Sequence, residues 1–179
     1  MKIIENPFEG VYLIEPKVIR DERGYFYESF NENTFRELTG TSVHFVQDNQ
    51  SFSSFGVIRG LHAQAGVHSQ AKLVRVLSGE VLDVIVDGRE DSSSYGKSYS
   101  VRLSGSNMLQ LFIPRGFFHG FAVLSDRAEF FYKCDNFYQR DSEIGVYYGD
   151  PDLEINWVIP NEKRILTEKD LSLPLFKTL

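Results

Sequence analysis

The most restrictive feature of the sequence is its punctuation by glycine and small polar residues, which leaves only short segments for regular structure. The segments between these breaks are rich in Val, Ile, Phe and Tyr, which favour strands over helices. We expect strands in KLVRVLSGEVLDVIVD (72–87), SYSVRLSG (98–105), MLQLFIP (108–114) and AEFFYKCDNFY (128–138). Many antiparallel strands with little helix predict an all-β sandwich or jelly roll.

The turn and helix signals refine this prediction. Ser78-Gly79 lies between two apolar arms, so we interpret residues 72–87 as a β-hairpin. Residues 31–40 begin with Asn and end with Gly, which predicts a short helix over residues 32–39. LTEKDLS (166–172) predicts one further helical turn.

Strand alternation assigns faces to two polar side chains. Lys72 shares a strand face with Val74 and Val76, and Tyr132 shares one with Phe130. If these apolar neighbours point into a barrel, Lys72 and Tyr132 point into it too. An inward lysine is costly unless it meets an anion or a polarised oxygen. The alternative, which the spacing alone favours, is that the Lys72 head reaches solvent at the strand end.

Length and charge restrict the class of protein. The 179 residues suit a single domain over 1–179, and no linker or internal repeat divides them. The net charge of −6 provides no basic field for nucleic acid or an anionic membrane, so an anionic ligand requires a local basic cluster. Cys134 is the single cysteine. The first residues lack the apolar core of a secretory signal and no apolar run reaches membrane-spanning length, so we expect a cytoplasmic protein.

A metal site is incompletely specified. Metal-binding cupins, a jelly-roll superfamily, combine a His-x-His pair and a Glu with a later Pro-x-Gly-x-x-His segment. The later segment is present as PRGFFH (114–119), but His62 is followed by Ala63 and Gln64 instead of a second histidine. Scattered histidines without a clustered carboxylate make a poor divalent-metal site. We therefore expect no metal and no cofactor.

General acid–base chemistry fits the remaining polar residues. It requires a histidine, a carboxylate to orient it, a proton donor such as tyrosine, and a cation near a developing oxyanion. Each candidate also has a purely structural interpretation. These are a hydrogen-bonded His62, an Asp170 that caps a turn with Thr167, a packing Tyr132, and a surface ion pair between Arg23 and Glu28.

Taken together, the ordered motifs resemble the dTDP-4-dehydrorhamnose 3,5-epimerase family. The motifs are DERGYFYESF, FVQDNQSFSSFGVIRGLH, QAKLVRVLSGEVLDVIVD, LFIPRGFFHGFAVLSDRAEFFYKCDNFY and LTEKD. The resemblance extends from about Gly10 to the C-terminus. It implies a metal-free cupin jelly roll, usually a homodimer, that epimerises dTDP-4-dehydro-6-deoxy-D-glucose at C3 and C5 in deoxysugar biosynthesis.

The resemblance also implies a role for each matching residue. His62 looks like the base that removes a proton beside the sugar ketone, and Asp170 like the carboxylate that orients it. Tyr132 looks like the acid on the opposite ring face, and Lys72 like the group that stabilises the enolate. Contacts to the nucleotide sugar are implied for Arg23, Glu28, Gln47, Asp48, Asn49, Arg59, Lys72, His119, Glu143 and Lys169, and thymine stacking for Tyr138.

Some positions differ from the family pattern. Ala63 stands where most relatives carry an aromatic, so we expect a wider pocket or a shifted pocket floor beside His62. His68 has no assigned role. The alternatives are a single-centre epimerase of a related 4-keto nucleotide sugar, a 3,4-ketoisomerase, a metal-dependent cupin oxygenase and a non-catalytic sugar-binding cupin.

Overall fold

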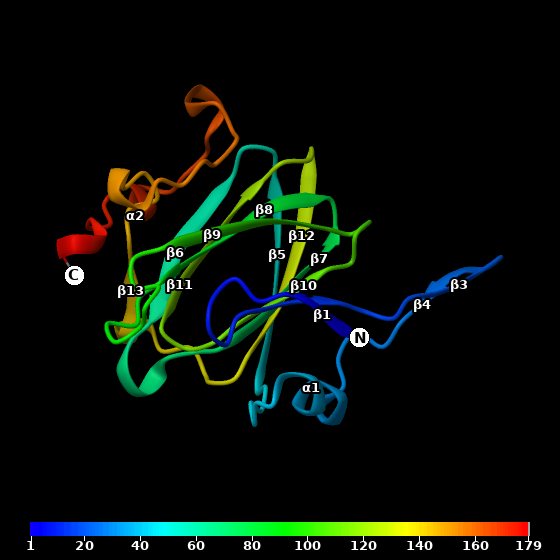
Figure 1. Ribbon diagram of the computed structural model, residues 1–179. Helices are drawn as coiled ribbons and strands as arrows, with labels where there is room; N and C mark the ends of the chain where they lie inside the picture. The colour runs from blue at the N-terminus through cyan, green and yellow to red at the C-terminus, as the bar shows by residue number, and fades with distance from the viewer. Residues whose placement is uncertain (179) are drawn as a thin grey trace.

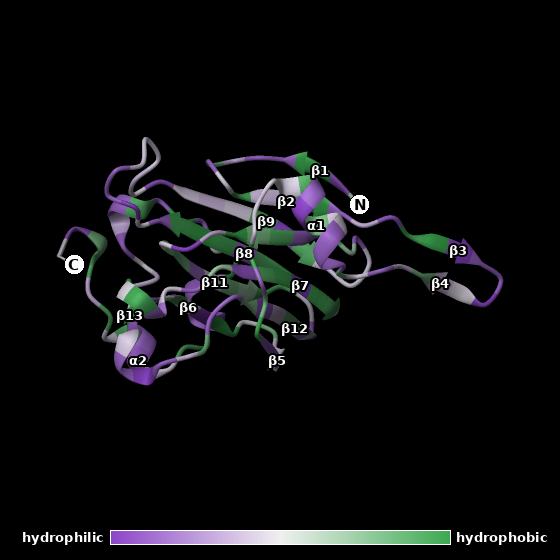
Figure 2. Cartoon of the chain, turned by 90° about the horizontal axis from the view of Figure 1, so that it is seen from below, coloured by the Kyte–Doolittle hydropathy of each residue, from purple (hydrophilic) through white to green (hydrophobic). Residues whose placement is uncertain are grey.

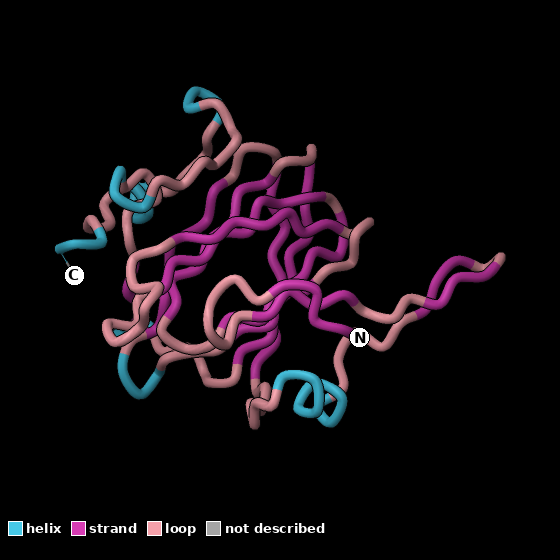
Figure 3. Tube along the Cα trace, in the orientation of Figure 1, coloured by secondary structure: helices cyan, strands magenta, loops and turns pink. Residues whose placement is uncertain are grey.

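The computed structural model describes residues 1–178, which form two facing antiparallel sheets with the helices at the periphery (Figures 1 and 3). The first sheet contains, in spatial order, β1 (Lys2–Glu5), β2 (Tyr12–Glu15), β10 (Gln110–Ile113), β7 (Lys72–Ser78), β12 (Arg127–Cys134) and β5 (Gln47–Ser54). The second contains β13 (Glu143–Gly145), β6 (Ile58–Gln64), β11 (Phe117–Val123), β8 (Glu80–Asp87) and β9 (Ser98–Ser104). The predicted all-β jelly-roll class is confirmed.

The helices are short and begin and end where the sequence predicts. Helix α1 (Glu32–Thr39) follows Asn31, whose side chain accepts the Thr34 N–H, and stops at Gly40 in the left-handed conformation. Helix α2 (Glu168–Leu171) is the predicted C-terminal turn. Single 3₁₀ turns occupy Gly66–His68, Arg140–Ser142, Pro151–Leu153, Asn161–Lys163 and Phe176–Thr178.

The predicted hairpin over residues 72–87 is wrong in its pairing. Both arms are strands, but β7 pairs with β10 and β12 in the first sheet, whereas β8 pairs with β11 and β9 in the second. Gly79, at φ 80°, carries the chain from one sheet to the other, and a Cβ there would meet the Arg127 carbonyl at 2.0 Å. The turn residues specify a sharp change of direction, but tertiary packing selects the partners.

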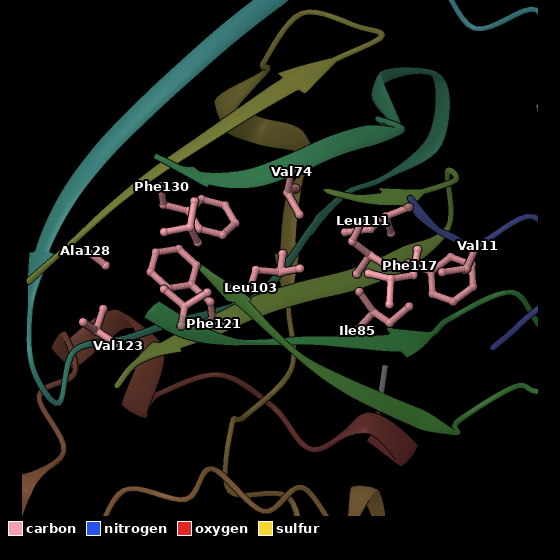
Figure 4. Close-up of a cluster of buried hydrophobic side chains, with 14 residues drawn as sticks. Val11, Val74, Ile85, Leu103, Leu111, Phe117, Phe121, Val123, Ala128 and Phe130 are labelled. Atoms are coloured by element: carbon pink, nitrogen blue, oxygen red, sulfur yellow. The ribbon is translucent and has the colours of Figure 1, made fainter. Parts of the chain in front are cut away.

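The main core fills the space between the sheets (Figure 4). Phe121 from β11 and Phe130 from β12 stack with ring centroids 4.3 Å apart, so this pair joins the two sheets directly. The other buried members of this interior cluster are Val11, Leu13, Val74, Val76, Val81, Ile85, Leu103, Leu111, Ile113, Phe117, Val123 and Ala128. Strands that contribute every second residue to this cluster must point the residues of the same parity inward.

Two smaller cores cover the outer faces of the sheets. Helix α1 packs Phe35 against Phe112 on the first sheet. The C-terminal segment packs Trp157 and Phe176 against the outer face of the second sheet, where Val84 is buried. The hydropathy colouring shows apolar strands between more polar loops and helices (Figure 2).

A separate hairpin, β3 (Ile19–Asp21) and β4 (Gly24–Phe26), projects away from both sheets (Figures 1 and 2). It carries apolar side chains into solvent: Ile19 is 55% exposed, Tyr25 56% and Phe26 70%. This arm therefore presents apolar side chains that its own barrel does not cover. Within residues 1–178, no helix has the length and apolar character needed to cross a membrane.

Candidate active site

The interior of the barrel receives polar side chains from both sheets. Lys72 and Tyr132 have the same parity as Val74 and Phe130 of the interior cluster, as the alternation predicts. The Lys72 ammonium lies 5.9 Å from the centroid of the Tyr132 ring. Desolvation at this position lowers the pKa of Lys72. Burial likewise raises the pKa of Tyr132 to about 12. The Lys72 side chain is half-buried on this inner face of the barrel.

His62 and Asp170 meet across 108 residues of sequence. His62 lies on β6, opposite His119 of β11, and Asp170 lies on helix α2. The distance between His62 Nε2 and Asp170 Oδ1 is 2.7 Å. The Asp170 side chain is only 5% exposed, which strengthens this contact by excluding water.

Asp170 also serves the helix, as its capping pattern predicts. The Asp170 N–H donates to the Thr167 hydroxyl oxygen, and that hydroxyl donates to Asp170 Oδ2 at 2.7 Å. Burial opposes ionisation of Asp170, but the hydrogen bonds from His62 and Thr167 outweigh it, and the pKa of the carboxyl is lowered. The carboxylate makes both contacts at once, because each of its oxygens has its own partner.

A second carboxylate lies near the other nitrogen of His62. Glu143 Oε1 is 3.9 Å from His62 Nδ1 and accepts a hydrogen bond from Lys169 Nζ at 2.6 Å. The Tyr138 hydroxyl donates to Glu143 Oε2 at 2.7 Å. Burial of Glu143 works against its charge, yet Lys169 and Tyr138 hold its pKa below the usual value. Three residues predicted to contact the nucleotide sugar thus form one network beside His62.

Other predicted contacts come from β5 and β6. The Gln47 side chain accepts the Tyr138 N–H at 3.0 Å and donates to Asn49 Oδ1 at 3.0 Å. Arg59 reaches across to the other sheet, where its Nε donates to the Ser53 hydroxyl at 3.1 Å. These contacts add amides and a guanidinium to the polar side chains of β5 and β6.

Three predicted contacts lie elsewhere. Asp48 points out of the first sheet and pairs with Lys133. Arg23 lies at the tip of the projecting hairpin and pairs with Asp21. Glu28 accepts a hydrogen bond from the Asn31 amide at 3.2 Å. The proposed surface ion pair between Arg23 and Glu28 is therefore wrong, and the chain by itself does not bring these residues to His62.

Sequence reasoning missed Asp83. It lies on β8 with its side chain fully buried, and its Oδ2 is 2.9 Å from His119 Nε2. The available signal was a single carboxylate in the apolar run VLDVIV, with the parity of Val81 and Ile85 in the interior cluster.

The substitution at Ala63 does not reshape the pocket as expected. Ala63 packs with the apolar cluster on the outer face of the second sheet, on the other side of β6 from the His62 side chain. An aromatic at this position would therefore contact the C-terminal segment instead of the ligand. His68 ends a 3₁₀ turn and acquires no role from its surroundings. Among residues 1–178, no group of three or more His, Cys, Asp or Glu residues is arranged to hold a metal ion.

A family model and several known proteins match this chain. The family model described as dTDP-4-dehydrorhamnose 3,5-epimerase matches residues 5–178. A curated enzyme of that name from Shigella flexneri is 49% identical over 172 residues, covering 96% of this chain and 94% of the relative.

Two solved structures are close to this one. The dTDP-4-dehydrorhamnose 3,5-epimerase of Elizabethkingia anophelis is 57% identical with a TM-score of 0.96, covering 99% of this chain and 97% of that one. A dTDP-6-deoxy-D-glucose-3,5-epimerase from Legionella pneumophila, in complex with dTDP-4-keto-L-rhamnose, is 46% identical with a TM-score of 0.95, covering 99% and 94%.

Proposed function

The chain belongs to the dTDP-4-dehydrorhamnose 3,5-epimerase family, and we propose that it is an isomerase that converts dTDP-4-dehydro-6-deoxy-D-glucose to dTDP-4-dehydro-L-rhamnose. The Legionella relative was solved with the corresponding keto sugar, which supports the same substrate class for this chain. The observation that carries the proposal is that His62, held by Asp170 of helix α2, lies on one sheet, whereas Tyr132 and Lys72 lie on the other.

The reaction needs only proton transfers. C3 and C5 both flank the C4 ketone, which acidifies the hydrogen on each. His62 Nε2 is held by Asp170, so Nδ1 is the nitrogen that takes the proton. The C–H electron pair becomes the C=C bond of an enolate, and the negative charge moves to the C4 oxygen. The Lys72 ammonium stabilises that oxygen.

Inversion requires the new proton to arrive from the opposite ring face. Tyr132 donates from the first sheet, whereas His62 acts from the second. With the pKa of Tyr132 raised to about 12, the phenol stays protonated at neutral pH and can serve as the donor. After each inversion, the proton on His62 returns to Tyr132 by way of solvent, and the same groups act on the second carbon.

Substrate binding uses polar side chains that the two sheets contribute. The guanidinium of Arg59 and the imidazole of His119 suit the diphosphate and the sugar oxygens, despite the net charge of −6. Tyr138 is half exposed, so its ring face is available for stacking on the thymine. We place Gln47, Asn49, Glu143 and Lys169 around the nucleotide, because hydrogen bonds connect them to Tyr138 directly or through a neighbour.

The working unit is a homodimer. Arg23 lies on a hairpin that projects away from its own barrel with Tyr25 and Phe26 exposed. A second copy would cover these side chains, and each Arg23 would then reach the site of the partner. We place the single-domain enzyme in the cytoplasm, because its one thiol, Cys134, is buried and no disulfide stabilises the fold.

Deuterium exchange tests the function. The protein is incubated with dTDP-4-dehydro-6-deoxy-D-glucose in deuterated water, and the ring protons are followed by NMR. Deuterium entry at both C3 and C5 with formation of the L-sugar is the expected result. Entry at one carbon would instead indicate a single-centre epimerase, and ketone migration to C3 would indicate an isomerase of the 3,4 type. If no deuterium enters the sugar, the result would support the alternative of a non-catalytic sugar-binding cupin.

A further inference from the structure

The buried carboxylate of Asp83 is unusual in its surroundings. Its side chain has no exposed surface and stands on β8 between Val81 and Ile85, which belong to the interior cluster. Among residues 1–178, no hydrogen-bond donor meets its Oδ1. A buried carboxylate with an unsatisfied oxygen costs several kcal/mol of stability in order of magnitude. A residue that weakens the fold in this way has a reason outside the fold.

The partners of Asp83 are residues of the proposed site. His119 on β11 has the parity of Phe121, which lies opposite Asp83, so the two side chains are diagonal neighbours on the inner face. Their contact, Nε2 to Oδ2, measures 2.9 Å. Because Nε2 is engaged, Nδ1 is the His119 nitrogen that remains for a ligand.

Lys72 points inward from the opposite sheet, and its charge acts on Asp83 without a direct contact. Its ammonium has no hydrogen bond or ion pair among the described residues, so more distant charges decide its protonation. Burial disfavours the charged form, and the groups that oppose this effect are Cys134 from β12, Asp83 from β8 and Glu143 from β13. Asp83 in turn contacts His119, and its charge also acts on Lys72 and on Tyr99 of β9.

We propose that Asp83 is a positioning residue of the epimerase site, which fixes the His119 ring through Nε2 and keeps Lys72 protonated for the enolate oxygen. This inference rests on the proposed function. Asp83 acts through its two neighbours and touches no reacting atom. Burial raises the pKa of Asp83, while His119 and Lys72 counteract that rise, so the three groups share their charge as one unit.

Replacement of Asp83 by Asn tests the inference, since Asn keeps the size and an acceptor for Nε2 but removes the charge. We expect kcat to fall about 10- to 100-fold with KM changed by no more than about twofold, because the loss concerns charge that develops in the transition state. The alkaline limb of the kcat–pH profile should move to lower pH, since Lys72 then loses its proton more easily. The melting temperature should change little, because Asn keeps the size of the side chain and its contact with His119 Nε2.

Asp87→Asn is the matched control. Asp87 lies on the same strand with the same parity and no exposed side-chain surface, but its partners are Arg89, Ser92 and Ser94 at the strand end. This variant should lose stability and keep the kcat–pH profile. The inference is overturned if Asp83→Asn retains the wild-type kcat and alkaline limb, or if its activity loss only follows a lower melting temperature.

A measurement on the wild-type protein covers the case in which Asp83→Asn does not fold. Nitrogen-15 NMR of the histidine side chains should show a proton on His119 Nε2, and an unprotonated Nε2 would overturn the inference. Wild-type exchange of the substrate protons is recorded in the same series. Its absence refutes the proposed function, whereas exchange that is equal in wild type and Asp83→Asn refutes only the role of Asp83.

Discussion

Replacement of Asp170 by Asn isolates the charge that His62 contacts. Asn has the same shape, so its carbonyl oxygen can still face His62 Nε2 at the position of Oδ1. The amide group, however, cannot accept the proton of the Thr167 hydroxyl as Oδ2 does. The variant therefore retains the ring position approximately and loses the negative charge that stabilises a protonated His62.

The size of the effect follows from the contact. A hydrogen bond between charged groups is worth about 1.5–3 kcal/mol, roughly twice a neutral one. The 2.7 Å distance and the 5% exposure of the carboxylate place this contact among the stronger ones. With a factor of ten for about 1.4 kcal/mol, the predicted decrease in kcat is about 10- to 150-fold.

The assay is deuterium entry at C3 and C5 under saturating substrate, recorded beside the melting temperature. Thr167→Ala is the control, because it removes the cap of α2 and leaves the contact between Asp170 and His62. It should reduce stability by about 1 kcal/mol and reduce exchange far less than Asp170→Asn does. If the two variants lose the same activity, Asp170 acts only as a capping residue and the orienting role is refuted.

Further predictions concern other parts of the molecule. Tyr132→Phe should retain deuterium exchange while forming the L-sugar at least about 100-fold more slowly, and equal loss of both would contradict its role as the donor. Arg23→Ala and His62→Ala proteins should each be inactive but regain activity when mixed and allowed to exchange subunits, and no recovery would contradict a site shared between protomers. Burial opposes the charge of Asp87, but its hydrogen bonds lower its pKa from 3.8 to about 2. The resulting stability is present above pH 3.8 and is lost as pH falls towards about 2, so Asp87→Asn should cost about 2 kcal/mol in urea unfolding near pH 7 and little at low pH. Gly79→Ala should destabilise the fold by more than about 2 kcal/mol in the same assay, since its φ is positive and its Cβ would overlap a backbone carbonyl.

Local sequence rules predicted the elements whose causes are local. Helix α1 ends at Gly40 because the residues that form its cap are adjacent in sequence. Strand alternation placed Lys72 and Tyr132 on the faces of Val74 and Phe130, but it did not decide that Lys72 points inward, because the spacing alone favoured a head that reaches solvent. The β7–β8 hairpin failed because turn residues do not specify which sheet receives each arm. Local rules also did not decide on which side of β6 the Ala63 side chain lies, because the packing of the C-terminal segment determines which side is the outer one.

The candidate site depended on more than local rules. His62 and Asp170 are 108 residues apart, and only the family motifs joined them before the structure did. Asp83 was not found, because an unpaired carboxylate in an apolar strand gains its meaning from His119 on the neighbouring strand. The projection of Arg23 away from its own barrel also had no local signature.

The stacked rings of Phe121 and Phe130 span the gap between the sheet that carries His62 and the sheet that carries Tyr132. In the proposed mechanism, an enolate that does not receive a proton from Tyr132 takes one back from His62 and reverts to the starting sugar. The ratio of isotope exchange to product therefore depends on the distance between the two sheets. Under the proposed mechanism, shortening one of these rings would change the ratio of isotope exchange to inverted product without altering a polar atom. The apolar packing would then influence how often a proton abstraction ends in inversion.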